Sequence, residues 1–118
     1  MAGVPVIPYK LISAGSTNAT SIKASAGRVH VIIASNVNAA VRYLKLYDMA
    51  TAPTVGTHVP KWTIPLPGGA VGTGIPIIIP EGGLDFGAGI AIALTTEATD
   101  AGTTGVSANE TVVNIGYS

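Results

Sequence analysis

The chain has 118 residues, no cysteine, six basic and six acidic residues, and a formal net charge of zero at pH 7. The lack of cysteine excludes disulfides, thiolate metal sites and cysteine nucleophiles, and the scattered basic residues form no patch that would bind nucleic acid. Only 10% of the residues are charged, less than half of the usual fraction, so we expect other protein to cover part of the surface.

No segment of the sequence is expected to cross a membrane or to direct export. The longest apolar run, residues 75–80, is too short to span a bilayer and contains two prolines. Residues 1–12 lack the basic region of a signal peptide and are interrupted by Pro5 and Pro8. We therefore expect one soluble domain over residues 1–118, in which residues 1–12 form either a strand of the domain or an arm exchanged with a neighbour.

Short β-branched runs alternate with turn signals about every ten residues, a rhythm typical of all-β proteins. The predicted strands are residues 4–12, 20–24, 28–35, 41–47, 61–66, 75–79, 90–95 and 111–117. No long segment has helical periodicity. The sequence therefore predicts an antiparallel β-sandwich, jelly-roll-like, with about eight strands.

Alternation of apolar and polar residues assigns one face of each predicted strand to the core. In strand 28–35 it places Val29, Val31 and Ile33 on the core face, opposite Ile32. The other core residues expected in this way are Leu44, Leu46, Trp62, Ile64, Leu66, Ile90, Ile92, Leu94, Val113, Ile115 and Tyr117.

Proline residues bracket two of the predicted strands, residues 61–66 and residues 75–79. A proline cannot donate a hydrogen bond to a neighbouring strand, so we expect both strands at sheet margins. Prolines there also oppose uncontrolled strand addition. The prolines concerned are Pro60, Pro65, Pro67, Pro76 and Pro80.

Two connections are longer than a compact sandwich needs, and such loops are usually functional or disordered. Residues 48–60 contain Pro53 and Pro60, so we expect an ordered excursion there. Residues 96–110 are rich in alanine, glycine and threonine, and we expect this loop to be mobile until a partner docks on it.

The candidate contact residues lie on one predicted strand and in the first long loop. If Leu44 and Leu46 face the core, Tyr43, Lys45 and Tyr47 form an aromatic–basic–aromatic stripe on the outer face. Tyrosine combines a large contact area with a polar tip, which suits a protein interface, although an exposed face that merely carries tyrosines is the plainer alternative. Beside this stripe we place Thr54, Val55 and His58 of the loop.

The sequence contains little that could carry catalysis. His30 and His58 could form an acid–base pair or bind a metal, but no HxH or HExxH spacing supports this, and a hydrogen-bonded strand histidine with a loop histidine is the simpler interpretation. Four residues of the second loop could bind calcium, but they lack the usual dense alternation of Asp and Asn. They are Glu97, Asp100, Asn109 and Glu110. We expect no enzymatic activity, no cofactor and no metal.

Two stretches of the chain are similar to a known group of proteins. These are ASAGRVHVIIASNVNAAVRYLKLYDMATAPTVGTHVPKWTIPLP and LDFGAGIAIALTTEATDAGTTGVSANETVVNIGY. They resemble small β-sandwich structural proteins of tailed bacteriophages and prophages, including capsid decoration or cement proteins. The resemblance implies a non-enzymatic virion protein on the capsid surface, made in the bacterial host cytoplasm. It also implies the major capsid protein as partner and a homo-oligomer, with a trimer favoured.

Other binding functions stay open at this stage. The resemblance also fits a tail, baseplate or fibre-associated sandwich, although the chain has no coiled-coil heptads or stalk repeats. A carbohydrate-binding module would use exposed aromatic rings, and Trp62 is expected in the core.

Overall fold

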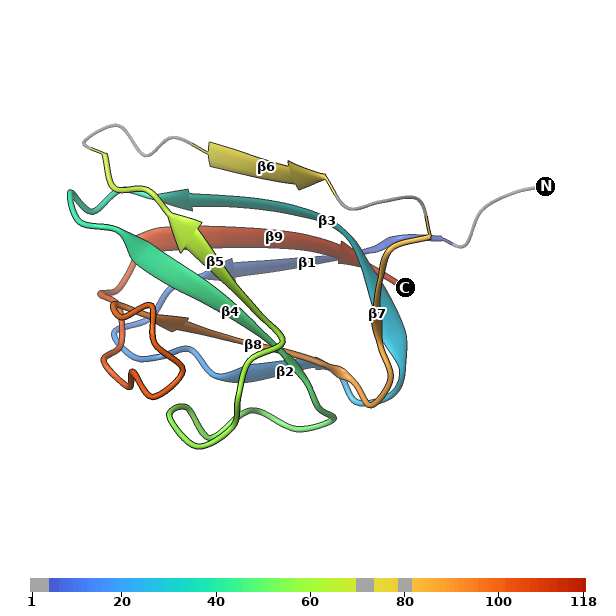
Figure 1. Cartoon of the computed structure of the whole chain (residues 1–118). Coiled ribbons are helices and arrows are strands. Elements are labelled where there is room, and N and C mark those ends of the chain that lie inside the picture. The colour runs from blue at the N-terminus through green and yellow to red at the C-terminus, as the bar shows by residue number, and fades with distance from the viewer. Residues whose placement is uncertain (1–4, 70–73, 79–81) are drawn as a thin grey trace.

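The computed structural model describes residues 5–69, 74–78 and 82–118. In this part of the chain nine β-strands form two antiparallel sheets packed face to face, which confirms the predicted antiparallel β-sandwich (Figure 1). We call the sheets A and B. Sheet A consists of β1 (Ile7–Ile12), β9 (Thr111–Tyr117), β3 (Gly27–Asn36) and β6 (Gly74–Ile78), in this spatial order, and β7 (Leu84–Phe86) also pairs with β3. Sheet B consists of β2 (Thr20–Lys23), β8 (Ile90–Thr95), β4 (Arg42–Asp48) and β5 (Trp62–Leu66).

The hydrophobic core fills the space between the two sheets. Successive side chains of a β-strand point to opposite faces of its sheet, so alternate side chains of these strands point into this space. The expected core residues that are buried are Val29, Leu44, Leu46, Leu66, Ile90, Ile92, Leu94, Val113 and Ile115. Trp62, Ile64 and Tyr117 are partly buried and pack against them. The alternation of these strands therefore identified most of the core.

The predicted face assignment of β3 is correct at Val29 and wrong for the residues that follow it. Val29 pairs with Tyr117 and Val31 pairs with Gly116, so β3 has one extra residue, His30, at a β-bulge. The extra residue shifts the alternation by one position. As a result Ile32 is buried, whereas Ile33 is 47% exposed on the outer face of sheet A.

The two strands bracketed by prolines do lie at sheet margins. β5, which contains Pro65, ends sheet B, and β6, which contains Pro76, ends the main path of sheet A. The other two margins are β1, which contains Pro8, and the four-residue strand β2.

Some boundaries of the prediction differ from the structure. Strand β7 was not predicted, because three residues between glycines are too few for a periodic pattern. Val4, Ile79 and Pro80, which the prediction placed in or beside strands, lie outside the described residues. No helix in the described part of the chain is long and apolar enough to cross a membrane.

Candidate interaction surfaces

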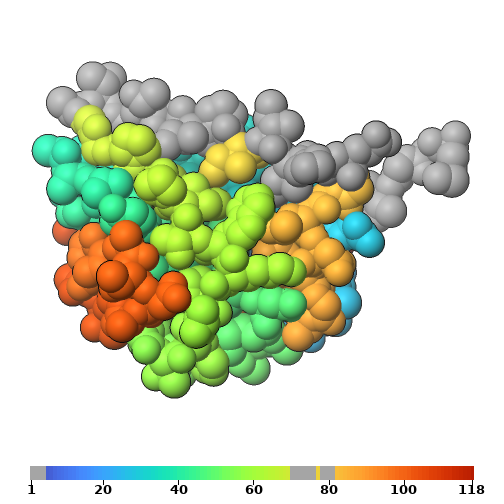
Figure 2. Space-filling model, in the orientation of Figure 1, coloured from blue at the N-terminus to red at the C-terminus, as the bar shows by residue number. Residues whose placement is uncertain are grey.

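The outer face of sheet B is covered by the two long connections of the chain, loop 49–61 and loop 96–110. The two loops are in close contact. A Cβ atom added to Gly56 of loop 49–61 would lie only 2.5 Å from Thr103 Cγ2 of loop 96–110. Figure 2 shows loop 96–110, in dark orange, beside the green to yellow-green residues of loop 49–61 and β5. Backbone hydrogen bonds fix the second loop, among them Thr96 N–H to Thr104 O at 3.0 Å and Val106 N–H to Ser16 O at 3.0 Å. In the structure loop 96–110 is therefore packed and hydrogen-bonded, in contrast to our expectation of a mobile loop.

This covering layer buries two of the three residues that we expected in an exposed stripe. Lys45 and Tyr47 are 0% and 1% exposed, and only Tyr43 is partly exposed. The Tyr47 ring packs with Ala91 and Ala93 of β8, with Val55 of loop 49–61 nearby. The expectation of an outward stripe is wrong for Lys45 and Tyr47, because it considered only β4 and not the loops that fold over it.

Burial shifts the pKa of both side chains. Lys45 Nζ donates a hydrogen bond to the Thr99 carbonyl oxygen at 2.6 Å. Burial lowers the pKa of Lys45, and the carboxylates of Glu97 and Asp100 oppose this effect. Burial raises the pKa of Tyr47, and Asp100 adds to the increase. The hydrogen bond from the Lys45 ammonium to Thr99 thus ties loop 96–110 to sheet B.

The other predicted contact residues lie at a tight turn within loop 49–61. Thr54 and His58 are exposed, and Val55 is partly buried against Tyr47. The backbone N–H of Thr54 donates to Nδ1 of His58 at 2.8 Å, so the imidazole closes the turn. Because Lys45 and Tyr47 are buried, the six predicted contact residues do not form one exposed surface.

Glu97 of loop 96–110 binds a partner within the same loop. Glu97 accepts hydrogen bonds from the backbone and side chain of Thr104, at 3.0 and 2.5 Å, which lower its pKa. Among the described residues, no three histidine, aspartate or glutamate side chains are grouped so that they could hold a metal ion.

Glu110 joins the end of loop 96–110 to two neighbouring segments. Its carboxylate accepts hydrogen bonds from Arg42 Nε at 2.7 Å and Asn38 Nδ2 at 2.6 Å, and from the backbone N–H of Ser107 at 3.3 Å. Burial alone would raise the pKa of Glu110, but these bonds outweigh it and hold the pKa below its ordinary value. Glu110 is 5% exposed, so this cluster supports the fold rather than a surface site.

The two histidines lie apart in the chain and have separate partners. His30, at the bulge of β3, is hydrogen-bonded through Nε2 to Ser118 Oγ at 2.8 Å. His58 bonds within its own turn, as described above. The interpretation as a hydrogen-bonded strand histidine and a loop histidine is confirmed.

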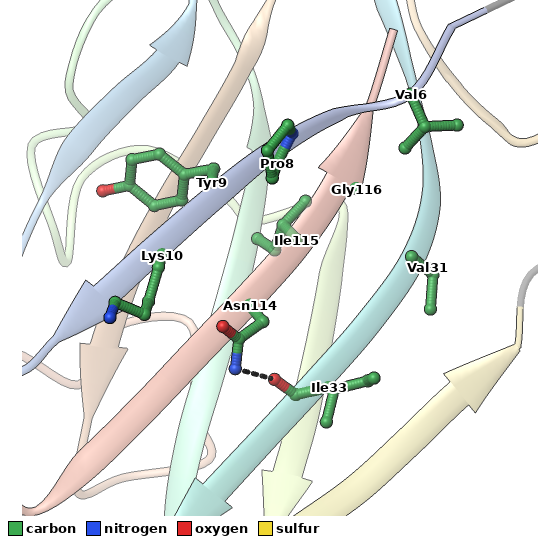
Figure 3. A pocket seen from close by; sticks show the side chains of 9 residues that line it. All are labelled: Val6, Pro8, Tyr9, Lys10, Val31, Ile33, Asn114, Ile115 and Gly116. Atoms are coloured by element: carbon green, nitrogen blue, oxygen red, sulfur yellow. Dashed lines mark hydrogen bonds between the residues drawn. The ribbon is translucent and has the colours of Figure 1, made fainter.

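In contrast to sheet B, sheet A leaves an apolar groove open on its outer face (Figure 3). The groove follows β9 between β1 and β3, and its volume is about 560 Å³. Ile33 and Val6 are 47% and 49% exposed there. Its lining residues are Val6, Pro8, Tyr9, Lys10, Val31, Ile33, Asn114, Ile115 and Gly116.

Glycine at position 116 shapes one end of the groove. A Cβ atom there would lie 2.7 Å from Val6 Cγ1 and 2.8 Å from Val31 Cγ1, so both side chains close over the bare backbone. At the other end Lys10 and Asn114 are direct partners across β1 and β9. Asn114 Nδ2 donates to the Ile33 carbonyl oxygen at 3.2 Å. The groove therefore has an apolar end and a polar end.

Sequence reasoning missed this groove because of the bulge in β3. Without the bulge, Val31 and Ile33 would lie in the core and only Ile32 of the three would face outward, so the outer face of β3 was not expected to carry two neighbouring apolar side chains. The one available signal was the unbroken run of three apolar residues from Val31 to Ile33, which strict alternation cannot place on a single face.

Comparison with known proteins gives the chain no relative: no family model, no curated protein and no solved structure matches it.

Proposed function

We propose that this chain is a non-enzymatic structural protein of the virion of a tailed bacteriophage or prophage, a decoration or cement protein that binds the head shell. In this proposal it attaches to the major capsid protein on the capsid surface as a homo-oligomer, most simply a trimer. Stabilisation follows by mass action, since a subunit that binds only the mature shell favours that state.

The observation that carries the proposal is the open apolar groove of sheet A in a chain with only 10% charged residues. The other surfaces of the sandwich are less suited to a partner. Sheet B is covered by loops 49–61 and 96–110, and three of the four marginal strands contain a proline. Such margins resist pairing with another chain, so the contact is expected through the face of sheet A.

The strand order supports the jelly-roll interpretation within this proposal. The strand orders are β1-β9-β3-β6 in sheet A and β2-β8-β4-β5 in sheet B, with β7 as an additional strand. These are the orders expected when eight strands fold as two Greek keys. Viral capsid domains commonly have this architecture. The carboxylates of Glu97 and Glu110 bond to Thr104 and Arg42, which favours structural roles for them over catalytic ones.

The test is the copy number of this chain in purified parent particles, measured by quantitative mass spectrometry against the major capsid protein. We expect hundreds of copies, near the stoichiometry of the shell. A few to a few dozen copies would instead assign the chain to the tail or baseplate, and absence from particles would overturn a virion role.

A further inference from the structure

We propose that the groove of sheet A binds an extended segment of the partner protein, and that this segment carries apolar side chains and one carboxylate. The inference rests on the proposed function for the existence of a partner protein. It adds the position of the contact and the chemistry of what occupies it.

The shape of the groove selects a narrow occupant. Asn114 and Gly116 of β9 form its floor, whereas Pro8 and Lys10 lie on one side and Ile33 on the other (Figure 3). Two such hollow faces would touch only along their rims, so a second copy of the same face fits poorly. An extended segment has a rise of about 3.3 Å per residue, so three or four residues are enough to follow β9 along the groove.

The way in which the occupant binds follows from the two boundaries of the groove. The occupant lies over β9. The backbone of β9 is already paired with β1 on one side and with β3 on the other, so the occupant cannot pair with β9 as an added strand. Binding must therefore come from side chains. Val6, Val31 and Ile33 supply apolar contacts, which requires apolar side chains on the segment.

The charge of the groove selects the carboxylate. Lys10 is the one charged residue among those that line the groove. In the described part of the chain the ion pairs are Arg42 with Glu110 and Lys61 with Asp48, so neither of them neutralises Lys10. Lys10 lies directly across from Asn114, whose amide has a second N–H to donate. A lysine and an asparagine that are direct cross-strand partners at the end of an apolar groove are together complementary to one acidic side chain.

The first experiment measures binding of the full chain to purified parent shells that lack it, by co-sedimentation over a range of protein concentrations. We expect Ile33→Asp and Lys10→Glu each to weaken binding by about tenfold or more. Lys10→Arg keeps the positive charge and should bind within about twofold of the unchanged chain. Val59→Asp is the matched control for Ile33→Asp, because Val59 is 71% exposed but lies in loop 49–61, away from the groove.

The outcomes separate the two proposals. If the unchanged chain does not bind the shells, both the decoration function and the groove inference are overturned. If it binds and the groove variants bind equally well, only the groove inference is overturned. If Ile33→Asp weakens binding no more than Val59→Asp does, the groove inference is likewise overturned.

A second experiment identifies the occupant directly. A photo-crosslinking amino acid at position 33 is activated on assembled particles, and the crosslinked peptide is identified by mass spectrometry. We expect a peptide of a shell protein that contains Asp or Glu within a few residues of the crosslink. Crosslinks mainly to another copy of this chain, or to a partner segment without an acidic residue, would contradict the inference.

Discussion

The burial of Tyr47 under the chain's own loops can be tested by comparing two tyrosines of one strand. Tyr47 is 1% exposed and packs with Ala91 and Ala93, whereas Tyr43, four residues earlier on β4, is partly exposed. We expect Tyr47→Ser to lower the free energy of unfolding strongly and Tyr43→Ser to lower it little.

The magnitude follows from the area that the Tyr47 ring removes from water. A fully buried tyrosine covers about 150–250 Å², and at about 25 cal/mol per Å² this area contributes roughly 4–6 kcal/mol. Replacement of a large buried aromatic residue by a small one costs about 3–5 kcal/mol in measured cases. Since small domains are stable by only about 5–15 kcal/mol, Tyr47→Ser should leave the fold marginal. For the partly exposed Tyr43 we expect about 1 kcal/mol.

Equilibrium unfolding in urea, followed by tryptophan fluorescence of Trp62 and by circular dichroism, measures both variants. Tyr47→Phe is the control, because it keeps the ring and removes a buried hydroxyl that has no hydrogen-bond partner among the described residues. It should cost little or nothing. Equal losses of less than about 1 kcal/mol for the two serine variants would refute the packing of the loops on sheet B.

Three further predictions concern the core, an ion pair and the groove. Leu46→Ala should cost about 2–5 kcal/mol in urea unfolding, because the side chain is fully buried; a loss below about 1 kcal/mol would contradict this. Glu110→Gln should lower stability by about 2 kcal/mol at neutral pH, because it removes the charged partner of Arg42. The depressed pKa of Glu110 makes its contribution full above the ordinary glutamate pKa and lost as the pH falls through the depressed value. The difference between the variant and the unchanged chain should therefore vanish in acid during urea unfolding at several pH values, and a constant difference would exclude this ion pair as its cause. Gly116→Ala should cost about 1–3 kcal/mol, since its Cβ meets Val6, and thermal unfolding that is unchanged would show that Val6 moves aside freely.

The sequence predicted the architecture well because the strands of a sandwich are local patterns. Alternation in Ile90, Ile92 and Leu94 located β8, and Pro65 and Pro76 placed their strands at the margins. Each of these signals acts within a few residues of the chain, so no knowledge of distant contacts is needed to interpret it.

The candidate site was harder to predict because it depends on contacts between distant segments. Lys45 is polar and alternates with leucines, yet it is buried because Thr99, far along the chain, lies over it. Ile33 is apolar, yet it is exposed because a single extra residue at His30 turns it outward. A bulge and a loop that folds back are decided by tertiary packing, which a local pattern does not record.

The central position of β9 in sheet A also sets the timing of folding during synthesis. β9 pairs with both β1 and β3, but it is made only after all residues between Asn36 and Thr111. At about 5–20 residues per second this delay is roughly 4–15 s. During that time the Ile- and Val-rich β3 lacks its partner strand β9. The chain also has few charges that would repel other nascent chains on the same messenger RNA. Slow translation or crowded ribosomes should therefore reduce the yield of folded protein, even when the finished sandwich is stable.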